Sequence, residues 1–252
     1  MANIGAFTCL AAGLKALRPE LGFVVVFALL FVSVSSLPIF IDHLQGIEYF
    51  TPPISLWGFF MNLVSWTSET FILAGVSQSV WGYRKKAVRA RVHLLPNEKS
   101  RQQILLWSIS FAVVVFGLHM GSQVWLKPPF HSSHSVPLPI LPLAFYFFAF
   151  VPLMIIDRQV GMWVAIKQVF SCAKTNLSSM LTLALTAEAI FLTISVLVIM
   201  LQHAIMDSYA ISKSVVADQA IAVIYAAAIG IINSAMMAVA FAEIHGLSEE
   251  SQ

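Results

Sequence analysis

Six long apolar runs, separated by shorter polar segments, dominate the pattern of the sequence. A helix needs about 20 predominantly apolar residues to cross the hydrocarbon core of a bilayer, so each run has about the length of one span. We therefore predict an all-α integral membrane protein in which residues 1–252 form a single six-helix transmembrane domain. The predicted spans are about 21–41, 55–81, 103–126, 138–156, 178–201 and 217–243.

The fourth run is shorter than the others and contains three prolines, Pro139, Pro142 and Pro152. Proline removes a backbone donor and clashes with the preceding turn of a helix. In a membrane, such a break is tolerated where neighbouring groups satisfy the freed backbone. We expect this span to be bent or broken.

The composition agrees with a chain that is mostly surrounded by lipid. Hydrophobic residues make up 59% of the 252 positions and charged residues only 10%, and the mean hydropathy is +0.85. Soluble domains carry about 25% charged residues, so a water-soluble surface cannot be built from so few charges. The lipid bilayer is therefore the expected partner, with bound phospholipid and no other cofactor.

The distribution of lysine and arginine predicts the orientation. If the N-terminus is cytoplasmic, the outer loops hold only Lys127 and Lys213, and the other 12 of the 14 basic residues lie on the inner side. Cytoplasmic loops carry such an excess, so we predict that both termini are cytoplasmic. The inner residues are Lys15, Arg18, Arg84, Lys85, Lys86, Arg89, Arg91, Lys99, Arg101, Arg158, Lys167 and Lys174.

Residues 4–20, 83–102 and 157–177 are basic and partly amphipathic, and each precedes a pair of spans. This pattern predicts short interfacial helices in the headgroup layer, although any inward-basic membrane protein shows a similar layout. The basic cluster in the second segment either binds anionic lipid heads or serves only as a topogenic signal. Nucleic-acid binding is excluded because the cluster is short and juxtamembrane. Its residues are Arg84, Lys85, Lys86, Arg89 and Arg91.

Small residues recur every fourth position along the sixth span. This spacing allows two helix backbones to approach closely in a bilayer, and the partner helix belongs either to this chain or to another subunit. The stripe consists of Ala222, Ala226, Gly230, Ser234, Ala238 and Ala242.

Two carboxylates, Glu69 and Glu188, lie near the middle of predicted spans. A charge at that depth costs at least about 2.5–3.5 kcal/mol on insertion scales, so such residues usually face the interior of the bundle. Two interpretations remain: a proton or cation relay, or neutral carboxyls that tie helices together. Polar groups that could join them are Asn62, Tyr146 and Asn233.

No enzyme motif is present, so we expect a protein that is not an enzyme. Histidines gather on the predicted outer side, but their spacing matches no known set of metal ligands. They are weak candidates for binding metal or haem, and no metal site is predicted. These residues are His119, His131, His134 and His203.

Residues 150–157 (FVPLMIID), the segment 165–172 (AIKQVFSC) and Asn176 resemble uncharacterised bacterial six-span inner-membrane proteins of the YciC-like, domain-of-unknown-function type. That resemblance covers about 30 residues at the motif level and implies a six-span fold in the bacterial cytoplasmic membrane. Val169 departs from the small serine that is usual in this family. The resemblance implies no reaction.

These observations favour a non-enzymatic accessory, assembly or scaffold subunit that binds a membrane-protein partner or forms a homo-oligomer. The alternative is a small transporter or lipid-handling protein that uses its mid-membrane carboxylates, and a cavity at that depth would favour it. Metal or haem binding on the outer face is a third, weaker alternative.

Overall fold

The computed structural model describes residues 5–44, 56–84, 94–125, 140–209 and 215–246. Within these ranges every regular element is helical and no strand is present, as predicted. The elements are α1 (Ala6–Leu17), the short 3-10 helix η1 (Arg18–Glu20), α2 (Leu21–Leu44), α3 (Leu56–Arg84), α4 (Glu98–Trp125), α5 (Ile140–Arg158), α6 (Met162–Thr175), α7 (Leu177–Tyr209) and α8 (Val215–His245).

Each of the six predicted spans coincides with one long helix, and the boundaries differ by up to eight residues. Within the described residues, two stretches, Ala6–Leu37 and Ala220–His245, are long and apolar enough to cross a membrane. The pair formed by α5 and α6 would be a third if it were a single bent span. Of the remaining helices, α7 contributes a shorter apolar stretch, Ser178–Ile194. Helix α3 is more polar and carries Ser65, Thr67, Ser68, Glu69 and Thr70 in one stretch.

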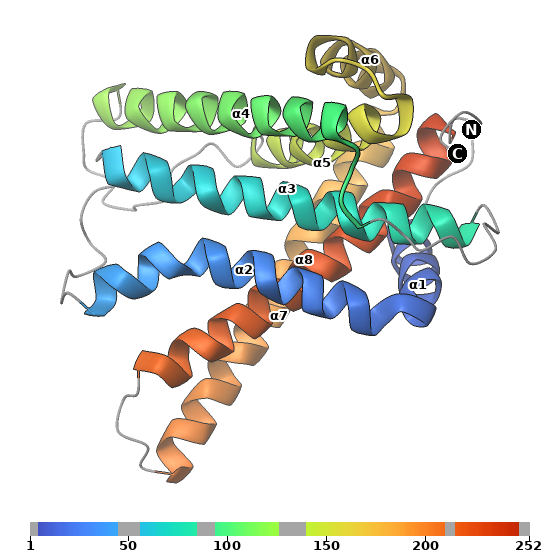
Figure 1. Ribbon diagram of the computed structural model, residues 1–252. Coiled ribbons are helices and arrows are strands. Elements are labelled where there is room, and N and C mark those ends of the chain that lie inside the picture. Colours follow the sequence, from blue (N-terminus) through green and yellow to red (C-terminus); the bar gives the residue numbers. More distant parts are fainter. Residues whose placement is uncertain (1–4, 45–55, 85–93, 126–139, 210–214, 247–252) are drawn as a thin grey trace.

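Helix α8 is the central element of the fold. It packs against α1, α2 and α3, while α2, α3 and α4 lie side by side and α7 accompanies α8 (Figure 1). The α7–α8 pair crosses this row of helices at an angle and diverges from it at the end away from α1. The helices therefore lie close together toward the end that carries α1 and spread apart toward the other end (Figure 1).

Helices α1 and α6 are turned away from the direction shared by α2, α3 and α4 (Figure 1). The axis of α6 makes an angle of 118° with the end of α5. The turn between them contains Gln159 at a positive φ of 51°, and Gly161 is the N-cap of α6. Helix α5 runs through Pro142 and Pro152 without interruption, so the predicted break does not lie within the proline-containing span. The 118° bend follows the span, between α5 and α6.

Both short helices are amphipathic in their burial. In α6, Ala165 and Val169 are buried while Trp163 is 70% exposed. In α1, Ala16 is buried while Phe7 is 73% exposed. The remaining predicted interfacial segment, 83–102, is described only in part: residues 85–93 lie outside the described residues, and residues 98–102 form the start of α4.

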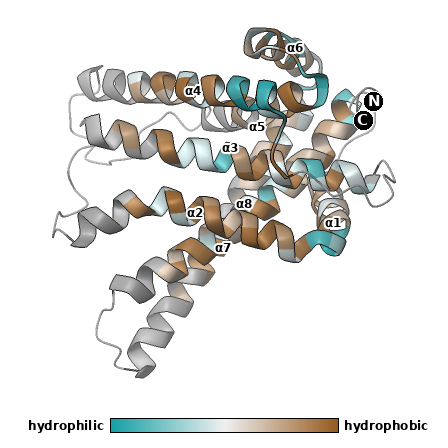
Figure 2. Cartoon of the chain, in the orientation of Figure 1, coloured by the Kyte–Doolittle hydropathy of each residue, from teal (hydrophilic) through white to brown (hydrophobic). Residues whose placement is uncertain are grey.

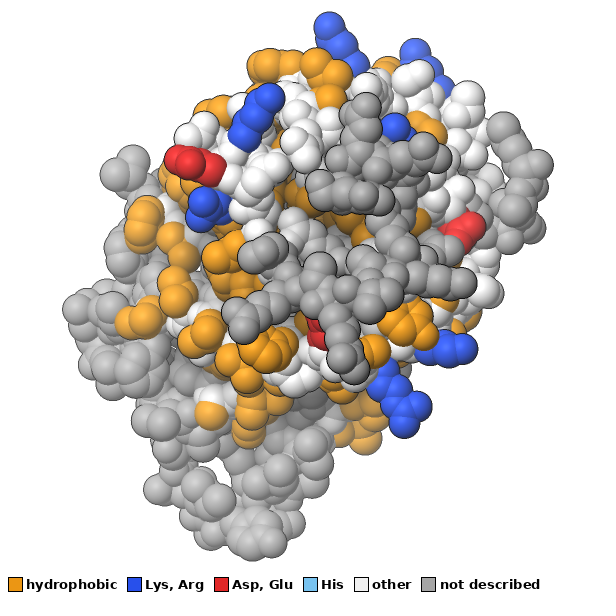
Figure 3. Space-filling view, turned by 45° about the vertical axis from the view of Figure 1, so that its right-hand side comes forward, with side chains coloured by type: hydrophobic (Ala, Val, Ile, Leu, Met, Phe, Trp, Pro, Cys, Tyr) orange, Lys and Arg blue, Asp and Glu red, His pale blue; other side chains and the backbone are white. Residues whose placement is uncertain are grey.

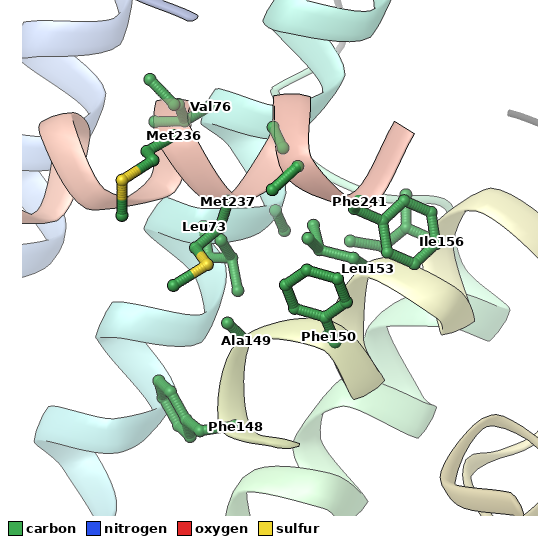
Figure 4. Packing of buried hydrophobic residues seen from close by; sticks show 14 of the residues in the cluster. Leu73, Val76, Phe148, Ala149, Phe150, Leu153, Ile156, Met236, Met237 and Phe241 are labelled. Atoms are coloured by element: carbon green, nitrogen blue, oxygen red, sulfur yellow. The ribbon is translucent and has the colours of Figure 1, made fainter. Parts of the chain in front are cut away.

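The hydrophobic core joins α3, α5 and α8. Leu73 and Val76 from α3, Phe150 and Leu153 from α5, and Met236, Met237 and Phe241 from α8 belong to one buried cluster (Figure 4). The indole N–H of Trp81 donates a hydrogen bond of 2.9 Å to the carbonyl oxygen of Ala238. This bond satisfies a buried donor and fixes the register of α3 against α8.

Large apolar side chains are exposed on several helices, and most of the described helices are hydrophobic along much of their length (Figure 2). A monomer in water rarely exposes contiguous apolar patches of more than a few hundred Å², so this surface is suited to lipid. Examples from three helices are Leu30 and Val34 on α2, Val113 and Val114 on α4, and Leu197 and Met200 on α7.

The described lysines and arginines gather at one end of the molecule. They lie on α1 and η1, at the start of α4, at the end of α5 and on α6. Figure 3, which brings this end forward, shows Lys and Arg side chains spread around it with hydrophobic side chains between them. The arrangement is the one that a positively charged inner face requires.

Candidate functional site

An open cavity of about 370 Å³ lies between α3 and α8. Its walls are completed by single turns of α2, α5 and α7. Most of the lining side chains are apolar, among them Leu73, Phe148, Ala149 and Met237, which also border the hydrophobic core (Figure 4). A largely apolar cavity with a few polar groups is the usual form of a small-molecule site.

Glu69 supplies the carboxylate of this cavity. It lies near the middle of α3, about 20 Å along the helix from either end at 1.5 Å per residue. Ser65, Ser68, Glu69 and Ile72 all line the cavity, because residues three and four apart share one face of a helix. The hydroxyl of Ser65 donates to Oε1 of Glu69 over 3.4 Å, and the Glu69 side chain is exposed to the opening.

Helix α8 forms the opposite wall. Tyr225, Ala226, Ile229, Gly230 and Asn233 follow one another at spacings of one and three residues and line the cavity. The Oδ1 atom of Asn233 is buried and has no hydrogen-bond partner. A buried acceptor without a donor costs about 1–3 kcal/mol, so a donor brought by a bound molecule would be stabilised there.

The small-residue stripe of α8 runs along this wall. Gly230 lies against Ile72 of α3, whose Cγ2 atom would be 3.5 Å from a Cβ added at Gly230. Ser234 lines the cavity, and the carbonyl of Ala238 accepts the bond from Trp81. The middle of the stripe therefore faces α3 of the same chain, whereas Ala222 and Ala226 are exposed and Ala242 is half-buried.

Two aromatic rings of the cavity were not among the predicted site residues. Trp66 and Phe148 both line it, and their ring centroids are 4.9 Å apart in an edge-to-face arrangement. Tyr225 of α8 lines it as well. No periodicity in the sequence distinguishes these rings from ordinary core or lipid-facing aromatics, because the approach of α5 to α3 decides which of them meet.

Several predicted site residues cannot be placed relative to this cavity. The side chains of Asn62, Tyr146 and Glu188 lie outside the described residues, although Ala187, the neighbour of Glu188, lines the cavity. The same holds for the side chains of His119, His131, His134 and His203, and for those of the basic cluster Arg84, Lys85, Lys86, Arg89 and Arg91. Among the described residues, no group of three His, Cys, Asp or Glu is arranged to hold a metal ion.

A second structural feature joins the end of α5 to the end of α8. The Arg158 guanidinium donates to the carbonyl oxygens of His245 at 3.2 Å and Gly246 at 3.3 Å. Its Nε atom also lies 3.1 Å from Oδ2 of the buried Asp157. A cation at the C-terminus of a helix satisfies carbonyls that lack an intrahelical partner. Arg158 therefore has a structural role as a cap of α8.

A further groove of about 440 Å³ opens between α2, α3 and α4. Leu30, Phe31, Leu105 and Ile109 line it, and the few polar side chains are Thr67 and Ser68. Its chemistry is that of a lipid-facing surface.

The cavity between α3 and α8 is therefore the best candidate site, because it alone joins a carboxylate, an unpaired acceptor and aromatic rings among the described residues. The resemblance to YciC-like proteins stays a prediction. No protein-family model, no curated protein and no solved structure matches the chain.

Proposed function

We propose that the chain is a six-span membrane protein, with both termini in the cytoplasm of a bacterial cell, that takes up an amphipathic small molecule in the cavity between α3 and α8. Six helices of suitable length support the six-span arrangement, and so do the exposed apolar faces of α2, α4 and α7. The basic side chains at the end that carries α1 and α6 support the orientation.

The observation that carries the ligand-binding part of the proposal is the mixed lining of the cavity. Glu69 lies halfway along α3, and Asn233 presents an acceptor without a partner. Around them lie apolar and aromatic side chains. A molecule with one polar head and one apolar body matches both kinds of wall. Of the functions considered for the sequence, this supports a small transporter or lipid-handling protein.

The accessory-subunit hypothesis rests on the small-residue stripe of α8. Gly230, Ser234 and Ala238 of this stripe lie against α3 or the cavity. That part of α8 is therefore not available for contact with a second protein. An accessory role would need another surface, and among the described residues the exposed apolar faces are equally suited to lipid.

The test is to fill the cavity without disturbing the fold. Ala226 lines the cavity and is exposed, so Ala226→Trp should occupy the space without overpacking the core. Wild type and variant are incubated with decylamine, decanol and decanoate in nanodiscs, and the bound amphipaths are counted by native mass spectrometry. At least one amphipath should bind wild type at one copy, and Ala226→Trp should reduce its occupancy at least about tenfold.

The matched control is Ala228→Trp, which places the same side chain at an exposed position of α8 that does not line the cavity. This variant should bind like wild type. If none of the three amphipaths binds, or if both tryptophan variants bind them as wild type does, the cavity is not a ligand site and the proposed function is wrong.

A further inference from the structure

The charge of the cavity defines the class of molecule that it takes. Among the described residues, its lining contains one carboxylate, that of Glu69, and no lysine, arginine or histidine. In its ionised form this carboxylate would repel an anion, and in a medium of low dielectric such charge interactions are far stronger than in water. A cation would be attracted by the same group.

The aromatic rings add to this preference. Trp66, Phe148 and Tyr225 contribute to the lining, and the negative face of an aromatic ring attracts ammonium groups, most strongly for tryptophan. Rings from α3, α5 and α8 thus surround the same space as the carboxylate. Recognition of quaternary ammonium groups commonly uses such a combination of rings.

Hydrogen bonding favours the same class. Asn233 offers Oδ1 as a buried acceptor without a partner. Glu69 receives a single long bond of 3.4 Å from Ser65. The oxygen atoms of both side chains can accept a hydrogen bond from the ligand or interact with its positive charge.

A bare metal ion does not fit as well. Calcium takes six to eight oxygen ligands and magnesium an octahedral set, and transition metals favour imidazole or thiolate. The lining residues that the structure describes include one carboxylate and no histidine or cysteine. The apolar walls instead suit a cation that carries its own hydrocarbon.

We infer that the cavity between α3 and α8 binds a lipophilic organic cation, a substituted ammonium whose charged head lies at Glu69 among the rings of Trp66 and Tyr225 and whose apolar part lies against the walls of α5 and α8. This inference rests on the proposed function and names the ligand class of the same site. Neutral amphipaths and anions are then the weaker ligands.

The experiment compares probes of one shape and different charge. Tritiated benzyltrimethylammonium is bound to the purified protein in detergent, and unlabelled benzyltrimethylammonium, its neutral carbon isostere neopentylbenzene and benzylsulfonate compete with it. The cation should compete at least about tenfold better than the isostere, since cation–π attraction and the carboxylate act on the cation alone. Benzylsulfonate should be the weakest competitor.

Two variants locate the effect. Glu69→Gln keeps the size of the side chain and removes its charge, so it should weaken binding of the cation about tenfold. Glu98→Gln, at an exposed position in the first turn of α4, removes the same charge outside the cavity and should leave binding unchanged. Circular dichroism and elution volume confirm that both variants fold.

The outcomes separate this inference from the proposed function. If neopentylbenzene or benzylsulfonate competes as well as the cation, or if Glu69→Gln binds the cation like wild type, the cation preference is wrong. The cation preference is also wrong if benzyltrimethylammonium does not bind wild type while decanol or decanoate does, and Ala226→Trp reduces the occupancy of that amphipath. Absence of binding for every probe, the three decyl amphipaths included, overturns the proposed function itself.

Discussion

Gln159, in the turn between α5 and α6, illustrates how much a single residue can depend on context. Its φ of 51° lies in the left-handed region, which costs a residue with a side chain roughly 1–2 kcal/mol. A hydrogen bond from α4 holds the turn in this conformation, because Oε1 of Gln103 accepts a hydrogen bond of 2.9 Å from the backbone N–H of Met162 in the first turn of α6.

We predict that Gln159→Gly raises the stability of the protein by about 1 kcal/mol, because glycine adopts positive φ without a steric penalty. Thermal unfolding of the purified protein in detergent measures the change. The control is Gln168→Gly, at an exposed position inside α6, where glycine should destabilise by about 0.5–1 kcal/mol. A lower melting temperature for Gln159→Gly would contradict the prediction.

At the scale of elements, the contact between α1 and α8 depends on one glycine. A Cβ added at Gly13 would lie 2.5 Å from the carbonyl oxygen of Ala235 and 2.7 Å from its carbon. Both atoms belong to the backbone, so no side-chain movement relieves the contact. Glycine therefore allows the two helices to cross closely, as small residues do in membrane bundles.

Gly13→Ala is predicted to push α1 away from α8 and to lower stability by about 1–3 kcal/mol, the usual range for overpacking. The loss would appear as a lower melting temperature and faster proteolysis near the N-terminus. Gly22→Ala is the matched control, because no atom lies within 4 Å of its added Cβ. That variant should be neutral or slightly stabilised, since alanine is the better helix former. Equal effects of the two substitutions would show that the α1–α8 contact has no special role.

At the scale of the whole molecule, the question is how many helices cross the bilayer. Lys99 near the start of α4 and Lys174 at the end of α6 are exposed at the same end of the bundle. Ser132 lies in the segment between α4 and α5. If α4 crosses the membrane and α5 returns, Ser132 lies on the other side.

This arrangement predicts the sidedness of three single-cysteine variants. After Cys9 and Cys172 are replaced by alanine, Ser132→Cys should react with a membrane-impermeant maleimide in intact bacterial cells. Lys99→Cys and Lys174→Cys should react only after the membrane is permeabilised. Labelling of all three from one side would mean that α4 and α5 do not cross, and the six-span proposal would fail.

Part of the candidate site was predictable from single residues. The sequence predicts Glu69 and Asn233 as site residues because burying a polar group in an apolar span costs free energy. Both residues line one cavity. Trp66 and Phe148 were not predicted, since aromatic residues are common on lipid-facing surfaces as well. The capping of α8 by Arg158 was not predictable either, because the two residues that meet there are 87 positions apart in the chain.

The sequence by itself determined the helical class and the approximate ends of the long helices, because apolar run length and flanking charge act locally along the chain. It also indicated that α8 would pack closely, through the spacing of its small residues. Only the tertiary structure decided that α8 packs against α3 and α1, that α6 turns sharply from α5, and that Glu69 shares a cavity with Asn233 and three aromatic rings. These features depend on which helix faces meet, and many pairings of similarly apolar faces are nearly equal in energy until the whole bundle packs.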